Sequence, residues 1–119
     1  MSSIYQEIIL DHYKNPHNFG SIKDPTNKTS AYNPLCGDRI EMDAVFIKDK
    51  VEEIKFRAQG CAISQASASI LTDHVLGKAK DELKKIDKDF MIELLGIELG
   101  PNRIRCALLS LEALHKLLM

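Results

Sequence analysis

Three cysteines and one aspartate are the residues of this sequence with the clearest potential for chemistry. Cys36, Gly37 and Asp38 stand in direct succession in the stretch NPLCGDRI, and Cys61 and Cys106 follow far downstream. Glycine permits backbone conformations that a side chain forbids, so a tight turn at Gly37 would aim Cys36 and Asp38 at one point. Three thiolates and one carboxylate make four ligands, the number that a zinc ion or an iron–sulfur unit takes.

Packing in the core is the structural alternative for these cysteines. Free cysteine is among the most buried residue types and often behaves as a small hydrophobe. The sequence contains no CxxC pair, and the wide separation of the three cysteines does not distinguish metal binding from packing. From the residues alone, both interpretations stay open.

The composition argues against some classes of function. The chain carries 16 basic and 17 acidic residues and a formal charge of −1, so no net charge would attract it to nucleic acid or to an anionic membrane. Its N-terminal apolar run is short and interrupted by charges, unlike a signal peptide, and no stretch reaches membrane-spanning length. We therefore expect one cytoplasmic domain over residues 1–119, in which the thiols are reduced.

Hydrophobic periodicity predicts an α+β fold. Residues 40–47 alternate between apolar and polar side chains, a polar KDK turn follows, and residues 51–59 form a second run, which together indicate a β-hairpin. The prolines and other turn-forming residues of positions 15–37 indicate loop, with a short strand near residues 29–33. Helices are predicted at residues 3–13, 64–76, 80–85, 89–95 and 104–118. We expect a small antiparallel sheet of about three strands packed against several helices.

These assignments place each cysteine at the end of an element. Cys36 lies in the loop that enters the hairpin, Cys61 lies between the hairpin and the next helix, and Cys106 lies in the first turn of the last helix. A helix N-terminus has unpaired N–H groups and the positive end of the helix dipole, which favour the thiolate form. Among three sulfurs, Asp38 would be a harder and weaker ligand than the thiolates.

Three motifs in order resemble one known family. The stretches IYQEIILDHYKNPHNFG, NPLCGD and GCAISQASASILTDHVLGK, followed by a cysteine after a proline near the last helix, are similar to the U-type iron–sulfur cluster assembly family. Its branches are IscU, the N-terminal domain of NifU, and SufU. The resemblance implies a NifU-like fold and a shared site formed by Cys36, Asp38, Cys61 and Cys106. The resemblance further implies that a transient [2Fe–2S] cluster is built at that site or that a zinc ion occupies it.

The branch within the family stays open. IscU-like members have a histidine directly before the third cysteine and a lysine two residues earlier, where this chain has Arg105 and Arg103. GCAISQASAS and the two arginines resemble SufU, but the span 77–101 is too short for the insertion that SufU members usually carry. The favoured function is a scaffold that assembles a cluster and transfers it to acceptor proteins. The alternative is a zinc-bound sulfurtransferase.

The family resemblance also implies partners and a sulfur acceptor. A cysteine desulfurase would supply sulfur in either role, apo iron–sulfur proteins would receive the cluster, and a homodimer or higher oligomer is an open alternative to a monomer. A scaffold or sulfur acceptor fits this pattern better than a stand-alone enzyme. As the thiol that accepts persulfide we favour Cys106 narrowly over Cys36, because a helix terminus, Arg103 and Arg105 would all stabilise its thiolate.

The remaining polar residues are assigned structural roles. The four histidines have no ligand spacing with the cysteines and are interpreted as surface or packing residues: His12, His17, His74 and His115. The serines after Cys61 are expected to allow close packing of a buried helix: Ser64, Ser67 and Ser69.

Overall fold

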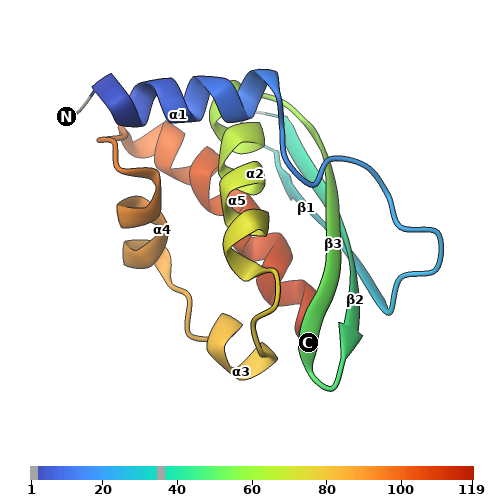
Figure 1. Ribbon diagram of the computed structural model, residues 1–119. Coiled ribbons are helices and arrows are strands. Elements are labelled where there is room, and N and C mark those ends of the chain that lie inside the picture. Colours follow the sequence, from blue (N-terminus) through green and yellow to red (C-terminus); the bar gives the residue numbers. More distant parts are fainter. Residues whose placement is uncertain (1–2, 35–36) are drawn as a thin grey trace.

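A computed structural model describes residues 3–34 and 37–119 of the chain, so Cys36 lies outside the described residues. The elements follow in the order helix, three strands and four helices (Figure 1). Their bounds are α1 (Ser3–Lys14), β1 (Asn27–Asn33), β2 (Asp38–Ile47), β3 (Lys50–Gln59), α2 (Ala62–Val75), α3 (Lys80–Leu83), α4 (Lys88–Leu95) and α5 (Pro101–Leu117). The predicted α+β class and the three-stranded antiparallel sheet are confirmed.

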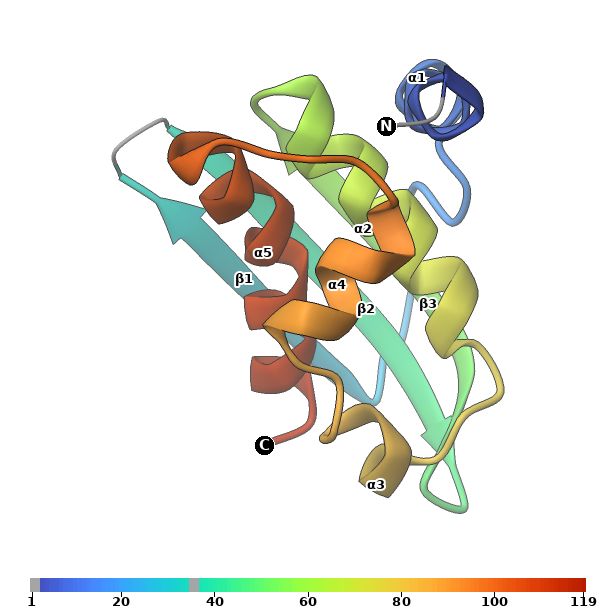
Figure 2. The ribbon, with the colours of Figure 1, turned by 90° about the vertical axis from the view of Figure 1, so that its left-hand side faces the viewer.

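The sheet has the strand order β1-β2-β3, and both pairs are antiparallel. The alternating residues Ile40, Met42 and Ala44 of β2 are buried, as their period of two predicts. On that face α2 and α5 lie side by side, and α4 packs over them, while α1 packs against α2 (Figure 2). None of the helices within the described ranges is long and apolar enough to cross a membrane.

Two helices begin at least two residues earlier than the sequence predicted, and one of them changes the position of a cysteine. Helix α2 begins at Ala62 rather than at residue 64, and α5 begins at Pro101 rather than at residue 104. Proline is favoured at the first helical position because its missing N–H has no partner there and its φ is already helical. Cys106 therefore lies in the second turn of α5, and its predicted place in the first turn was wrong.

A buried ion pair joins the sheet to the loop between α1 and β1. Asp43 was assigned to the polar side of β2, yet it is only 1 % exposed. Its carboxylate accepts hydrogen bonds from Arg57 at 3.1 and 3.2 Å and from the backbone N–H of Ile22 at 3.1 Å. Burial alone would raise the pKa of Asp43, but these donors and the guanidinium charge lower it. Arg57 also donates to the carbonyl oxygen of Gly20 at 2.9 Å, so the loop is tied to the sheet.

Replacing Arg57 with methionine should destabilise the fold markedly. The substitution keeps much of the apolar stem but leaves the carboxylate of Asp43 buried with only one backbone donor, which should lower the free energy of unfolding by about 2–3 kcal/mol. Glu41→Gln is the matched control, because Glu41 is a more exposed partner of the same arginine and should matter by less than about 1 kcal/mol. Urea unfolding of both variants measures the difference, and equal effects would contradict this account.

Candidate metal-binding site

Three of the four predicted site residues meet at one end of the molecule. Asp38 is the first residue of β2, Cys61 directly precedes α2, and Cys106 lies in α5. The starts of these three elements lie at the same end of the sheet (Figure 2). One potential ligand atom from each residue can be chosen so that all three lie within 4.8 Å of one another. The fourth residue, Cys36, precedes Gly37 and Asp38 in the chain but is not among the described residues.

Asp38 is the central residue of this group. Its side chain is buried, and Oδ1 accepts a hydrogen bond from the backbone N–H of Cys61 at 3.0 Å. Oδ2 accepts from the Cys61 thiol at 3.3 Å and from the Ser64 hydroxyl at 2.5 Å. Cys61 is the N-cap residue of α2 but makes no side-chain capping bond. The carboxylate from β2 therefore takes over part of the capping of α2, which ties the helix start to the strand.

The electrostatic state of Asp38 suits a metal ligand. Burial alone would raise its pKa, but hydrogen bonds from Ser64, the Cys106 thiol and both the backbone and thiol of Cys61 lower the pKa to about 2. The carboxylate is thus ionised at neutral pH. The thiols of Cys61 and Cys106 both donate hydrogen bonds to this carboxylate, and a divalent ion would replace their protons. The donor set of two thiolates and one carboxylate therefore fits zinc or iron.

Gly60 makes the close approach of Asp38 possible. Its φ is +132°, and a Cβ atom built on it would lie 2.1 Å from Oδ1 of Asp38 and 2.9 Å from Cα of Asp38. The second of these atoms belongs to the backbone of β2 and cannot rotate away. A glycine is thus required here both for its backbone conformation and for the space beside the carboxylate.

A cleft of about 370 Å³ opens beside the two described cysteines. Arg103 and Arg105, which precede Cys106 in the chain, line the cleft and are exposed, so the cleft has a cationic rim. Cys61 is half-buried, whereas Cys106 is 6 % exposed. The complete lining consists of Asn33, Cys61, Ala62, Ile63, Asn102, Arg103, Arg105 and Cys106.

The structure also brings together residues that the sequence did not connect. His12 and His17 were interpreted as surface or packing residues, yet a ligand atom of each lies within 4.8 Å of the other and of Asp73. His74 instead contacts the ring of Phe90, and His115 belongs to α5. No short-range signal could have found the group, because Asp73 stands on α2, far along the chain from both histidines.

A three-stranded antiparallel sheet with helices on one face, and cysteines and an aspartate at one end, defines a class of small α+β proteins with a thiolate and carboxylate site. The model of the family "NifU-like N terminal domain" matches residues 4–119, and the chain belongs to this family. The predicted family resemblance is thereby confirmed.

Curated relatives come from both branches that the sequence left open. The chain is 39% identical to the zinc-dependent sulfurtransferase SufU of Bacillus subtilis, with 98% of this chain and 90% of the relative covered. It is 34% identical to the iron–sulfur cluster assembly scaffold protein IscU of Streptococcus pyogenes, with 98% and 83% covered. Both alignments run over 133 positions, more than the 119 residues of this chain, so these relatives carry residues that it lacks.

A solved structure has nearly the same fold. The putative iron–sulfur cluster assembly scaffold protein for the SUF system of Fervidobacterium islandicum superposes with a TM-score of 0.83 at 29% identity. The match covers 98% of each chain.

Proposed function

We propose that this protein is a scaffold on which a transient [2Fe–2S] cluster is assembled from iron and desulfurase-derived sulfur and then transferred to acceptor proteins. The observation that carries the proposal is the convergence of Asp38, Cys61 and Cys106 within 4.8 Å. In this proposal Cys36 supplies the third thiolate. The cluster is cargo, so the site must bind it and also release it.

The mixed ligand set suits that double task. Thiolates bind cluster iron strongly, whereas a carboxylate oxygen is a harder ligand and a weaker one for this metal. Asp38 keeps its capping bond to the backbone of Cys61 through Oδ1, and Oδ2 faces the thiols. One oxygen can therefore bind and leave the iron while the other keeps the side chain in place. The cleft beside Arg103 and Arg105 gives a partner access to the site.

A zinc-bound sulfurtransferase is the second candidate, favoured by the 39% identity to the Bacillus subtilis enzyme of that name. Zinc at the same residues would hold the thiolates until a cysteine desulfurase docks. A thiolate of this chain then attacks the outer sulfur of the desulfurase persulfide, forms a new S–S bond and releases the desulfurase cysteine as thiolate. We propose Cys106 as the attacking residue, narrowly ahead of Cys36. Because Cys106 is 6 % exposed, its sulfur would be reached through the cleft.

Anaerobic reconstitution separates the two functions. If the protein is a scaffold, ferrous iron and sulfide should produce cluster absorbance, and each of Cys36→Ser, Cys61→Ser and Cys106→Ser should abolish or destabilise it. If it is a zinc-bound carrier, iron should not displace zinc, which binds nitrogen and sulfur sites more tightly than ferrous iron. Desulfurase turnover should then rise when the protein is added.

Mass spectrometry of the desulfurase-treated protein identifies the acceptor. A one-sulfur adduct mapped to Cys106 supports our choice, and an adduct confined to Cys36 contradicts it. If no cysteine carries an adduct and a stable cluster forms, the carrier function is excluded and the scaffold function remains.

A further inference from the structure

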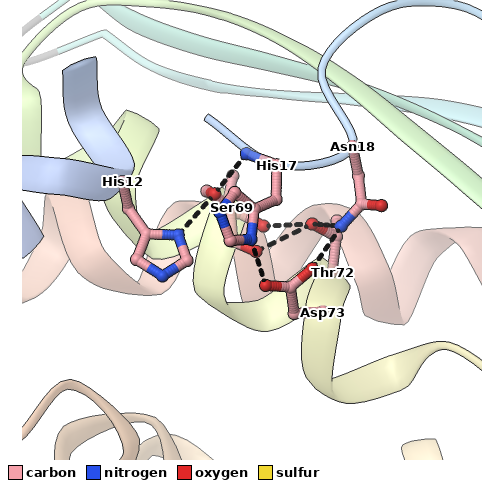
Figure 3. Close-up of polar contacts among 7 residues, drawn as sticks. His12, His17, Asn18, Ser69, Thr72 and Asp73 are labelled. Carbon is pink, nitrogen blue, oxygen red and sulfur yellow. Dashed lines mark hydrogen bonds and ion pairs between the residues drawn. The ribbon is translucent and has the colours of Figure 1, made fainter. Parts of the chain in front are cut away.

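A second group of metal-ligating side chains lies away from the cysteines. His12 comes from α1, His17 from the loop that follows it, and Asp73 from the last turn of α2 (Figure 3). Asp73 stands twelve residues after Cys61, which corresponds to about 18 Å along a helix at about 1.5 Å per residue. The group is therefore separate from the candidate site formed by Asp38, Cys61 and Cys106.

Two of the three side chains, those of His12 and Asp73, make a further contact outside the group, and the backbone of His17 makes another. Nδ1 of His12 lies 2.7 Å from the hydroxyl oxygen of Ser69, and the same oxygen accepts the backbone N–H of His17 at 2.8 Å. The carboxylate of Asp73 accepts from Asn18 at 2.9 Å and lies 2.5 Å from Nδ1 of His17. Such contacts orient imidazole and carboxylate ligands in metal sites and fix which ring nitrogen faces the ion.

We propose that His12, His17 and Asp73 bind a divalent first-row transition-metal ion such as zinc or ferrous iron. Two imidazoles and one carboxylate are the ligand set of sites for these metals, whereas magnesium and calcium take mainly oxygen ligands. The three residues would occupy part of the coordination sphere, and water would complete it from the exposed side.

The distances allow such a site after a small movement. The ligand atoms lie within 4.8 Å of one another, and metal bonds of about 2.0–2.2 Å require separations of about 3–3.5 Å. The side chains of His17 and Asp73 are 49% and 43% exposed, so they can move about an ångström without disturbing the core. The ion would insert between His17 and Asp73, which now contact each other directly.

The charges around the group favour a neutral imidazole at His12. Burial and the nearby His17 lower its pKa, and Asp73 and Asp11 only partly oppose them. The two rings lie 4.5 Å apart between centroids, so two imidazolium ions would repel each other there. The ion pair between His17 and Asp73 does not by itself explain why the ring of His12 lies so close to that of His17. A cation shared by both rings and the carboxylate accounts for all three residues.

Metal binding here would fasten α1 to the body of the protein. Among the described side chains of α1, Ile9 alone is buried, so this helix has little apolar anchorage of its own. The ion would connect α1, the following loop and α2 at one point. We therefore expect occupancy of the site to slow amide hydrogen exchange in α1.

Zinc titration calorimetry of the full chain tests the proposal. The parent protein should bind two equivalents of zinc, one at the cysteines and one at the histidines, and His17→Ala and His12→Ala should each bind one. His74→Ala is the matched control, since it removes a histidine of α2 outside the group and should keep both equivalents. An unchanged stoichiometry in His17→Ala, or the same loss in His74→Ala, would overturn the proposal.

A second titration keeps the two sites distinguishable. In the variant with Cys36, Cys61 and Cys106 all changed to serine, zinc should still bind with one equivalent and protect the amides of α1 from exchange. Adding His17→Ala to this variant should remove both effects. If the hydrogen bonds alone fasten α1, zinc should leave the exchange rates of the cysteine-free variant unchanged, and the proposed site does not exist.

Discussion

Replacing Gly60 with alanine should eliminate metal and cluster binding at the cysteines. The new Cβ would lie 2.1 Å from Oδ1 and 2.6 Å from Cγ of Asp38, far inside van der Waals contact. The new Cβ would also lie 2.9 Å from Cα of Asp38, so the backbone that carries Cys61 must move away from β2 and take its thiol away from the other ligands, whether or not Asp38 is one of them. The positive φ of +132° adds strain of about 1–3 kcal/mol for a residue with a side chain.

The variant Gly20→Ala separates the effect of backbone strain from the effect of the collision between the new Cβ and Asp38. Gly20 has a φ of +139°, close to that of Gly60, but a Cβ there would meet nothing within 4 Å. Both variants should lose comparable stability from the backbone, whereas only Gly60→Ala should lose the zinc equivalent at the cysteines in titration calorimetry and the cluster absorbance after reconstitution. A folded Gly60→Ala protein that binds zinc with the stoichiometry and affinity of the parent would show that the site does not need the close approach of Gly60 to β2.

Local patterns predicted the elements of this fold well because their causes are local. The alternation of Ile40, Met42 and Ala44 predicted the buried face of β2, and all three are buried. The end of α2 before Gly77 was also predicted, and Gly77 has the positive φ of +81° that a side chain disfavours. The start of α5 was missed although Pro101 gave a usable signal, since proline is favoured at the first helical position.

Contacts between distant segments were beyond the sequence. Asp43 stands opposite Lys55 in the register of β2 and β3, but its partner Arg57 is the diagonal neighbour two positions further on. Alternation places Asp43 on the polar side, and only the loop that returns over that side buries it. The same holds for the group of His12, His17 and Asp73, which exists only because α1 packs against α2.

The candidate site depends both on local sequence motifs and on contacts between distant segments. Motif resemblance placed Cys36, Asp38, Cys61 and Cys106 in one site, and the structure brings the three described members within reach of one another. What the motif did not reveal is that Asp38 also caps α2 through the backbone of Cys61. The residue that would release the cluster is therefore also the residue that holds the cysteine in position. These two roles can be separated by substitution.

Changing Asp38 to alanine should make a bound cluster longer-lived and its transfer to an acceptor protein slower. Removal of the carboxylate leaves three thiolates and takes away the hard oxygen through which iron is released, so we expect slowing by about 10- to 100-fold, the scale of other changes around metal ligands. The capping bond to Cys61 is lost as well, which should lower stability by about 1–2 kcal/mol.

Asp38→Asn is the matched variant, because its amide oxygen can still accept the N–H of Cys61 while the negative charge is absent. Transfer is followed by the absorbance or circular dichroism of the acceptor under anaerobic conditions. If Asp38→Asn is as stable as the parent and also transfers slowly, the carboxylate acts in release, whereas parental transfer rates in both variants would remove Asp38 from that step.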